Sequence, residues 1–295
     1  MTEQIKAYAK INLHLDIKSK RVDGFHDVET IMQSVSMCDD IRVTLTEDTE
    51  FLAECNVADV PTGDKNIAVR AARLFAERAS LNIGVRISIE KRIPMAAGLA
   101  GGSADAAAVL VAMNRLCDNK FSYEELCDMA AQLGSDVPFC VNGGCAYSEG
   151  RGEILTPFLS IPSDTVFVIA CGGEGVSTPW AYGLMDKEFD DFKKYQTRGV
   201  NGLRQTLESD VPEDFYMHIF NIFEAPVMAY RPAVAQIKDT MMQNGARAAM
   251  MSGSGPSVFG VFDDKNKAQA ATKALEDSGY FACVCAPAPM RNTVK

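Results

Sequence analysis

Several stretches of the chain alternate apolar and polar residues, which is the pattern of a half-buried strand. The clearest is "AYAKINLHLDI" at 7–17, and "VRISIEKRI" at 85–93 follows the same rule. The segment 28–48 predicts one or two further strands, after a turn around Gly24 in "RVDGFHD". Further strands are predicted by "TVFVIACGG" at 165–173, by both ends of "ARAAMMSGSGPSVFGVF" at 246–262, and by "YFACVCA" at 280–286.

Helical spacing of apolar residues marks the segments between these strands. The clearest helix is 122–134, where Ser122 and Glu125 form a capping box and Gly134 ends the helix. The other predicted helices cover 66–79, 103–116, 178–186, 199–208, 213–223, 232–244 and 265–277. The segment 135–153, "SDVPFCVNGGCAYSEGRGE", is predicted to be strand and loop.

Helices and strands occur in mixed order without regular alternation, which favours an α+β fold over a doubly wound sheet. A chain of 295 residues suggests two domains. The amino-acid composition changes near 156–164, where "TPFLSIPSD" carries two prolines. We therefore predict an N-terminal domain over 1–158 and a C-terminal domain over 159–295.

Charge and cysteine content narrow the classes of protein. The formal net charge of −10 and the pI of about 4.9 argue against binding of nucleic acid or anionic membrane by the whole surface. The nine cysteines include no paired C-x-x-C motifs at zinc spacing, and we interpret them as reduced, mostly buried thiols. The N-terminus has no apolar signal region, and no stretch reaches the ~18 apolar residues of a membrane span. We expect a cytoplasmic protein.

A glycine-rich segment between a predicted strand and a predicted helix is the main chemical signal. "IPMAAGLAGGSADAAAVLVAMNRL" at 93–116 matches neither the Walker motif nor the dinucleotide fingerprint. Glycines ahead of a helix are either a plain turn or a place where the backbone approaches a phosphate. Ser103 is a candidate to cap the helix, to bind a phosphate oxygen or to help hold a metal. Asp105 would lie in the first helical turn, where its charge suits the helix dipole.

Three segments together resemble one kinase superfamily. "PMAAGLAGGSADAA" is similar to the P-x-x-x-G-L-x-x-G-S-[SA] segment of the GHMP kinases, the galactokinase–homoserine kinase–mevalonate kinase superfamily. "AYAKINLHLDI" resembles its first motif, and "MMSGSGPSVFGVF" resembles its third, a glycine loop near the triphosphate. "RVDGFHDVETIMQSV", "GSDVPFCVNGGCAYSEGRGE" and "NIFEAPV" resemble the branch that phosphorylates 4-diphosphocytidyl-2-C-methyl-D-erythritol on its 2-hydroxyl, in non-mevalonate isoprenoid synthesis.

The resemblance implies a two-domain GHMP kinase fold with the active site in the cleft between the domains. It implies ATP and Mg²⁺, two small-molecule substrates, and no nucleic-acid or membrane partner. We expect a monomer or a homodimer. The metal ligands stay open, with Ser103 as one candidate.

The resemblance also assigns roles to residues. Asp136 would be the catalytic carboxylate beside the substrate hydroxyl, with Lys10 next to it. ATP would be bound by Pro94, Met95, Ala96, Ala97, Gly98, Leu99, Ala100, Gly101, Gly102, Ser103 and Ala104, with Asn66 and Lys91 near the adenine. The other substrate would be bound by Asn12, Phe25, His26, Thr178, Gly253, Ser254 and Gly255. In the family the position of Phe25 is often tyrosine, so a hydrogen bond through that hydroxyl is lost here. Ala100 replaces a glycine seen in some relatives.

Plainer interpretations exist for each residue. Asp136 alone is an ordinary helix-end aspartate, and Lys10 alone is a solvated lysine on a strand edge. By resemblance Asn12 would contact the methylerythritol part or support Lys10, and its plainer interpretation is a structural amide at a strand end. His26 could be a surface loop histidine, and 253–255 a tight strand connection. Two alternative functions also stay open: a kinase for another small alcohol such as homoserine or mevalonate, and a non-catalytic GHMP-fold sensor. The "GFH" loop argues against the first, and the presence of both Lys10 and Asp136 argues against the second.

Overall fold

The computed structural model describes residues 1–157, 161–188, 199–209 and 212–291. The strands are β1 Thr2–Lys20, β2 His26–Thr46, β3 Phe51–Cys55, β4 Gly84–Glu90, β5 Cys145–Glu149, β6 Ile154–Pro157, β7 Val166–Cys171, β8 Phe220–Asn221, β9 Ala248–Met251, β10 Val258–Phe262 and β11 Phe281–Cys285. The helices are α1 Ile67–Ala79, α2 Gly101–Leu116, α3 Tyr123–Leu133, α4 Val137–Asn142, α5 Thr178–Glu188, α6 Asn201–Leu207, α7 Glu224–Tyr230, α8 Pro232–Gln243 and α9 Lys265–Asp277, with a 3₁₀ helix η2 at Pro212–His218.

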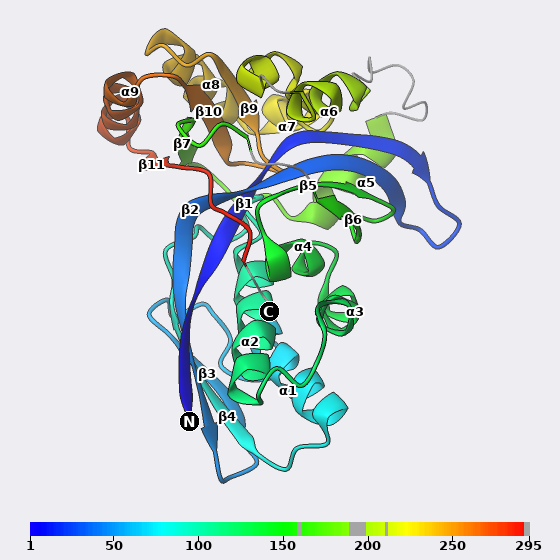
Figure 1. Ribbon diagram of the computed structural model, residues 1–295. Coiled ribbons are helices and arrows are strands. Elements are labelled where there is room, and N and C mark those ends of the chain that lie inside the picture. The colour runs from blue at the N-terminus through cyan, green and yellow to red at the C-terminus, as the bar shows by residue number, and fades with distance from the viewer. Residues whose placement is uncertain (158–160, 189–198, 210–211, 292–295) are drawn as a thin grey trace.

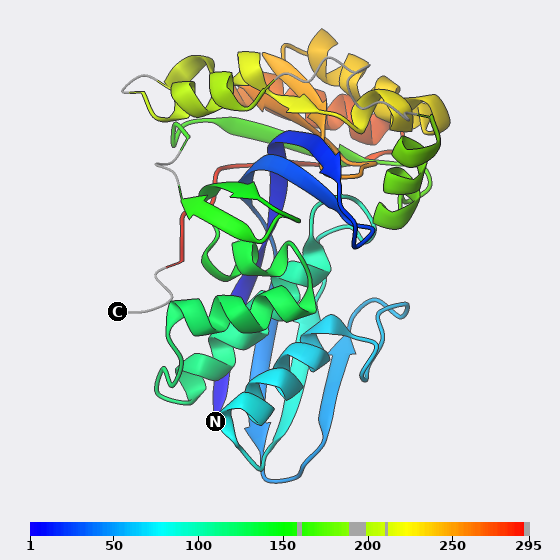
Figure 2. The same cartoon turned by 90° about the vertical axis from the view of Figure 1, so that its right-hand side faces the viewer.

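Two sheets organise the molecule (Figures 1 and 2). The larger follows the order β3-β4-β2-β1-β8, with β5 paired to β2 and β6 paired to β5. The smaller has the order β11-β7-β10-β9, and all of its pairs are antiparallel. Helices α1 and α2 pack on one face of the large sheet, and α8 and α9 pack on one face of the small sheet. The α+β arrangement predicted from the sequence is confirmed.

The long strand β1 connects the hydrophobic cores. Its odd-numbered apolar residues are buried in succession, because alternate side chains of a strand point to the same face. Ile5 and Ala7 pack in the core under α1 and α2, and Ile11 packs between the two sheets. Ile17 packs in the core under α8. The even-numbered polar residues of the strand point the other way, and two of them reach a cleft.

The C-terminal segment returns to the large sheet after β11, as the red trace of Figure 1 shows. Ala288 N–H donates to the carbonyl of Ser34, and Met290 forms an isolated bridge with Gly143. The strand β8 also joins the large sheet by pairing in parallel with β1. The boundary predicted between residues 158 and 159 falls on positions outside the described residues, so the two-domain division stays a prediction.

Two local predictions are wrong. The segment 135–153 begins with the helix α4 rather than with strand and loop, because Pro138 occupies the first helical turn, where proline is tolerated. The helix predicted over 213–223 is the 3₁₀ helix η2 followed by β8. The next helix, α7, was not predicted; it is short and carries Pro226 near its start, which hides its periodicity.

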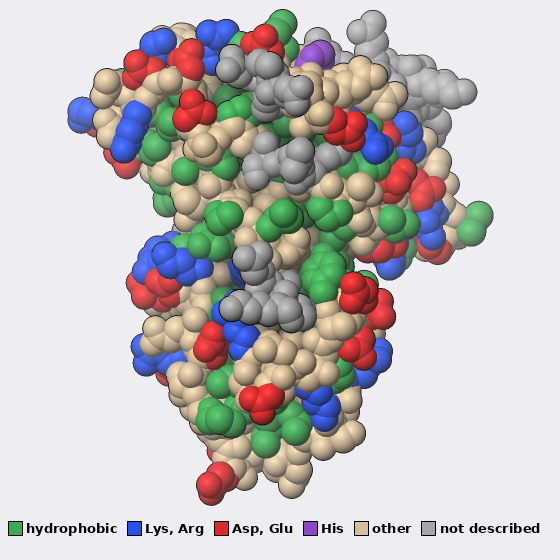
Figure 3. Space-filling model, in the orientation of Figure 1, with side chains coloured by type: hydrophobic (Ala, Val, Ile, Leu, Met, Phe, Trp, Pro, Cys, Tyr) green, Lys and Arg blue, Asp and Glu red, His purple; other side chains and the backbone are tan. Residues whose placement is uncertain are grey.

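The surface bears charges of both signs. On the face drawn in Figure 3, acidic and basic side chains are interspersed over the upper and lower parts of the molecule. All nine cysteines are free, as predicted, but four are buried and five are partly exposed, so the prediction that most are buried is wrong. Within the described ranges, none of the helices combines the length and the apolarity needed to cross a bilayer.

Candidate functional site

A cleft of about 960 Å³ lies where β1, the glycine-rich segment and α5 meet. Its lining includes Lys10, Asn12, Phe25, His26, Asn66, Lys91, Pro94, Met95, Ala96, Ala97, Gly98, Leu99, Ala100, Gly101, Gly102, Ser103, Asp136, Thr178, Gly253 and Ser254. Two of the predicted site residues do not line it. Ala104, on α2, is fully buried in the core, and Gly255 packs against Met251. The chain therefore brings nearly all the predicted residues to one place.

The glycine-rich segment is held by its carbonyl groups. Four successive carbonyls of this segment accept hydrogen bonds. The Ala96 carbonyl accepts from the N–H of Val176, and the Ala97 carbonyl accepts from the N–H of Ser257. The Gly98 carbonyl accepts from the Ser252 hydroxyl, and the Leu99 carbonyl accepts from the N–H of Lys10. These acceptors, which would repel a phosphate, are thus engaged by neighbouring elements. The start of α2 follows directly, and the unpaired N–H groups at a helix start attract anions.

The helix α2 starts earlier than the sequence suggested. It begins at Gly101, and Ala100 precedes it in the left-handed region at φ 57° with no side-chain cap. Ser103 is therefore the third helical residue, which excludes capping among its three candidate roles and leaves phosphate binding and metal binding as predictions. Asp105 lies beyond the first turn, so its predicted interaction with the helix dipole is also wrong.

The glycine-rich segment contacts a second glycine loop, residues 252–255. A Cβ on Gly98 would overlap the carbonyl oxygen of Ser252, and a Cβ on Gly253 would lie 2.9 Å from the carbonyl oxygen of Gly98. Both residues have positive φ. The close contact explains the glycines at 98 and 253, because any side chain would separate the loops.

Lys10 and Asp136 approach each other in the cleft. The Lys10 Nζ atom lies 3.5 Å from Asp136 Oδ2, and the Lys10 side chain is 5% exposed while that of Asp136 is 37% exposed. Lys10 Nζ also donates to Asn12 Oδ1 over 2.6 Å. Asp136 comes directly before α4, so a backbone turn and not a regular element places it opposite β1. The pair presents an accessible carboxylate with a buried ammonium behind it.

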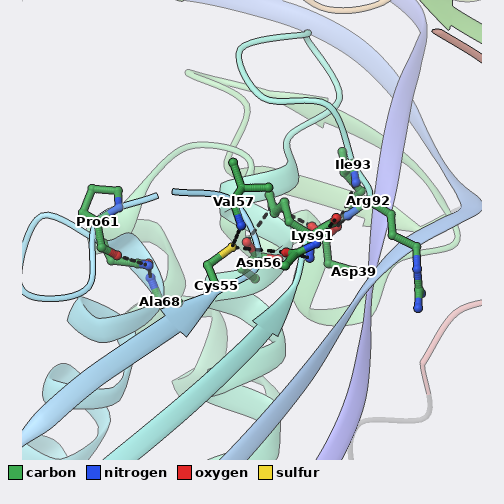
Figure 4. Close-up of polar contacts among 11 residues, drawn as sticks. Asp39, Cys55, Asn56, Val57, Pro61, Ala68, Lys91, Arg92 and Ile93 are labelled. Atoms are coloured by element: carbon green, nitrogen blue, oxygen red, sulfur yellow. Dashed lines mark hydrogen bonds and ion pairs between the residues drawn. The ribbon is translucent and has the colours of Figure 1, made fainter. Parts of the chain in front are cut away.

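Lys91 lies under the start of α2 and is held by two carboxylates, of which Figure 4 labels Asp39. Its Nζ atom is 2.6 Å from Asp39 Oδ2 and 2.7 Å from Asp105 Oδ2. Although burial opposes the charge, Asp105 and Asp39 raise the pKa of Lys91, and burial raises the pKa of Asp105. The ammonium is therefore engaged within the protein, and a direct contact of Lys91 with ATP stays a prediction.

Asp39 also shapes the approach to the glycine-rich segment. Its Oδ1 accepts the backbone N–H groups of Arg92 at 2.5 Å and Ile93 at 2.8 Å. Asn56 pairs with both backbone groups of Lys91, as Figure 4 shows. These contacts fix the residues that connect β4 to the segment, and sequence analysis assigned no role to either Asp39 or Asn56.

Asn66 closes another wall of the cleft. Its Oδ1 accepts the N–H of Ala68 and so caps α1, and its Nδ2 donates to the carbonyl of Pro61 over 2.8 Å. The cap ties the loop before α1 to the helix. Val60 and Lys65 of this loop line the cleft beside Asn66. Asn66 lines the cleft, and its place near the adenine of ATP stays a prediction.

An aromatic group forms the far end of the cleft. The His26 ring stacks on Tyr182 with centroids 4.8 Å apart, and His26 Nε2 lies 3.0 Å from Asp186 Oδ1. Partial burial opposes the charge on Asp186, but hydrogen bonds from Lys20 and His26 outweigh it and lower the pKa of this carboxyl. Phe25 is exposed, with the guanidinium of Arg151 5.2 Å from its ring centroid.

Thr178 joins α5 to the second glycine loop. Its hydroxyl lies 3.3 Å from the Ser254 hydroxyl. Asn221 of β8 donates to the carbonyls of Met251 and Gly253 and so fixes the same loop. Sequence analysis did not single out Asn221, Tyr182 or Asp186. Asn221 begins the quoted segment "NIFEAPV", whereas Tyr182 and Asp186 lie in none of the quoted segments.

Comparison with known proteins agrees with this geometry. Residues 66–144 match the model of the GHMP kinases N terminal domain, and residues 213–280 match that of the GHMP kinases C terminal. A 4-diphosphocytidyl-2-C-methyl-D-erythritol kinase of Clostridium perfringens is 40% identical over 281 residues, which are 95% of this chain and 96% of that protein. The enzyme of the same name from Brevibacillus brevis is 39% identical, over 93% of this chain and 92% of its own length.

The chain belongs to the 4-diphosphocytidyl-2-C-methyl-D-erythritol kinase family.

Solved structures place this family within a wider fold. A crystal structure of 4-(cytidine 5'-diphospho)-2C-methyl-D-erythritol kinase has a TM-score of 0.76 at 32% identity, covering 97% of this chain and all of that one. A homoserine kinase of Cytophaga hutchinsonii also reaches a TM-score of 0.76, at 18% identity and covering 99% of this chain and 96% of its own. The second likeness shows the shared GHMP kinase fold alone.

Proposed function

We propose that the protein is an ATP-dependent kinase that phosphorylates the 2-hydroxyl of 4-diphosphocytidyl-2-C-methyl-D-erythritol. One observation carries the proposal: the Lys10–Asp136 pair lies in a single cleft between the start of α2 and the aromatic group of His26 and Tyr182. A phosphate-binding end, a proton acceptor and a base-stacking end are what a kinase of a cytidylated alcohol needs. The family relationship supports the same substrate.

Asp136 and Lys10 would act on the hydroxyl. As the substrate oxygen bonds to the γ-phosphorus, the bond from that phosphorus to the oxygen bridging to the β-phosphate breaks, and ADP leaves. The hydroxyl proton passes to the Asp136 carboxylate, which is the accessible member of the pair. The Lys10 ammonium orients the carboxylate and offsets negative charge on the transferred oxygens.

The two ends of the cleft would hold the two substrates. The N–H groups at the start of α2 would bind phosphates of ATP, because the nearby carbonyls of the glycine-rich segment are bonded elsewhere. His26 and Tyr182 offer ring faces on which cytosine can stack. This aromatic end would have no task in a homoserine or mevalonate kinase, which supports the cytidylated substrate over those alternatives.

Mg²⁺ would accompany ATP, as in phosphoryl transfer generally. Among the described residues, no group of three or more His, Cys, Asp or Glu side chains is placed to hold a metal. The cleft instead offers isolated hard oxygen donors at Asp136 and Ser103, which fits a cation bound mainly by phosphates and water. The bound ion would neutralise charge on the phosphates.

We propose that the protein works in the cytoplasm on these two small molecules, as a monomer or a homodimer. The free state of all nine cysteines supports a reducing compartment.

The reaction is tested by identifying its product. Purified protein is incubated with ATP, Mg²⁺ and 4-diphosphocytidyl-2-C-methyl-D-erythritol, and the product is followed by phosphorus NMR. We expect one new phosphomonoester signal, on the 2-oxygen, that grows in step with ADP. Phosphate released to water without a new ester, or an ester at another oxygen, would contradict the proposal.

A further inference from the structure

We propose that Thr30, on β2, is a positioning residue that holds Lys10 in place through Asn12. The inference rests on the proposed function, because it concerns the same reaction. Thr30 is 3% exposed and reaches the wall of the cleft. It lies in the segment "RVDGFHDVETIMQSV", but sequence analysis assigned it no role.

The Thr30 hydroxyl has only one proton, and the backbone uses it. Thr30 Oγ1 donates to the carbonyl of His14 over 2.6 Å. A hydroxyl carries a single donor and two acceptor lone pairs, so toward any other neighbour this oxygen can only accept. The neighbour is Asn12, whose Nδ2 donates to Thr30 Oγ1 over 2.8 Å.

This hydrogen bond fixes which way the Asn12 amide faces. With Nδ2 turned to Thr30, Oδ1 is turned to Lys10 and accepts from its Nζ over 2.6 Å. The reversed amide would place its N–H donors against the Lys10 ammonium and its oxygen against the Thr30 oxygen, whose only proton is donated to His14. Asn12 is 3% exposed, so no exchange with bulk water would compensate for that orientation.

An irregularity in the strand pair brings Thr30 into this position. Asn12 is opposite Met32 and His14 is opposite Ile31, so the register shifts between Asn12 and His14. Such irregularities redirect side chains next to functional sites. Here the Thr30 hydroxyl bonds the His14 carbonyl and the Asn12 amide on either side of the shift.

Thr30 is thus two hydrogen bonds from the reacting groups. Lys10 Nζ lies 3.5 Å from Asp136 Oδ2, close enough that a small displacement changes the interaction. Without the Thr30 hydroxyl, the Asn12 amide can rotate, and the ammonium loses the neutral acceptor that places it. The start of α2 and the stacked rings of His26 and Tyr182 lie outside this chain of contacts.

Steady-state kinetics of Thr30→Val test the inference. Valine keeps the branched shape and removes the hydroxyl. We expect kcat to fall about 10- to 100-fold, as misplacement of a catalytic group does, with the KM of each substrate little changed. Thr30→Ser should restore most of kcat. The matched control is Thr44→Val, which removes a hydroxyl from the same strand outside the cleft, where it bonds Thr2.

A double-variant cycle separates positioning from general damage. If Thr30 acts through Asn12, Thr30→Val should lower kcat little further in an Asn12→Ala background. A kcat for Thr30→Val within about twofold of wild type, or a full independent loss in that background, would overturn the inference. Thermal melting checks folding, and Thr30→Ala replaces Thr30→Val throughout if the valine variant does not fold. Absence of turnover by the wild type would refute the proposed function instead.

Discussion

The ammonium nitrogen of Lys91 lies 2.7 Å from Asp105 Oδ2, directly beneath the first residue of α2. A Cβ added to Gly101 would come within 3.1 Å of the same nitrogen. With Asp39 on its other side, Lys91 links β2, β4 and α2 in one buried cluster. The helix start that we assign to phosphate binding therefore rests on an ion-pair network.

Removal of Lys91 should destabilise the protein strongly. Lys91→Met leaves Asp39 and Asp105 buried without their cation, and breaking a buried pair in this way costs about 3–5 kcal/mol of unfolding free energy. Urea unfolding measures the change. The neighbouring Arg92→Met is the control, because Arg92 is 48% exposed and its ion pairs should contribute about 1 kcal/mol or less. If Lys91→Met lowered the unfolding free energy by as little as Arg92→Met, the cluster would not be important for stability.

The helices and strands could be predicted from the sequence wherever a single hydrophobic periodicity dominates a segment. The alternation at 7–17 predicted the central strand, and the capping box at Ser122 predicted the start of α3. The start of α2 could not be placed correctly, because carbonyl contacts with distant segments determine where the helix begins. Local sequence holds no trace of those contacts.

The candidate site was predictable only in part for the same reason. Lys10 and Asp136 belong to motifs, and the structure brings them together. Ser252 contacts Asn12 across 240 positions of the chain, and Thr30 owes its place to a strand irregularity. A single polar residue in an apolar strand gives no indication of its partner, so supporting residues of this kind become visible only in three dimensions.

Loss of His26 should weaken binding of the cytidylated substrate selectively. Stacking on an aromatic side chain contributes about 1–3 kcal/mol per base, so His26→Ala should raise the KM for that substrate about 5- to 150-fold. The KM for ATP should stay near its wild-type value, because His26 lies at the other end of the cleft. Initial rates measured against each substrate separately test this. His218→Ala, at an exposed histidine on η2, is the control, and an equal effect on both KM values would contradict the assignment.

Asp16 should make stability depend on pH in a predictable direction. Burial raises the pKa of Asp16 to about 6, and its Oδ2 has no partner within the described part of the chain. The folded state therefore holds more protons than the unfolded state between about pH 4 and 6, and the contribution of Asp16 to stability falls as pH rises through about 6. Asp16→Asn should be more stable than wild type by on the order of 2 kcal/mol at about pH 8, with the difference shrinking toward about pH 5.

Urea unfolding at several pH values measures that difference. Asp27→Asn is the contrasting control, because a hydrogen bond from Arg21 lowers the pKa of Asp27 and its ionised form is favoured in the folded state. Its removal should lower stability at neutral pH rather than raise it. A stability gain for Asp16→Asn that does not change with pH would show that ionisation is not the cause.

Asp136→Asn should abolish most turnover and leave ATP binding intact. Removing a positioned proton acceptor costs about 10²- to 10⁴-fold in kcat. Calorimetric titration with ATP should give a dissociation constant close to wild type, since the start of α2 is untouched. Asp128→Asn, at an exposed position on the adjacent helix α3, controls for loss of charge. Undiminished turnover by Asp136→Asn would remove Asp136 from the mechanism, and weaker ATP binding would place it in the ATP site.

The central claim is that this cleft phosphorylates a cytidylated alcohol. The most direct measurement is ATP consumption by the purified protein with Mg²⁺, with 4-diphosphocytidyl-2-C-methyl-D-erythritol, homoserine and mevalonate offered side by side. We predict turnover with the cytidylated substrate alone. Turnover with homoserine or mevalonate, or no turnover by folded protein that binds ATP, would contradict it.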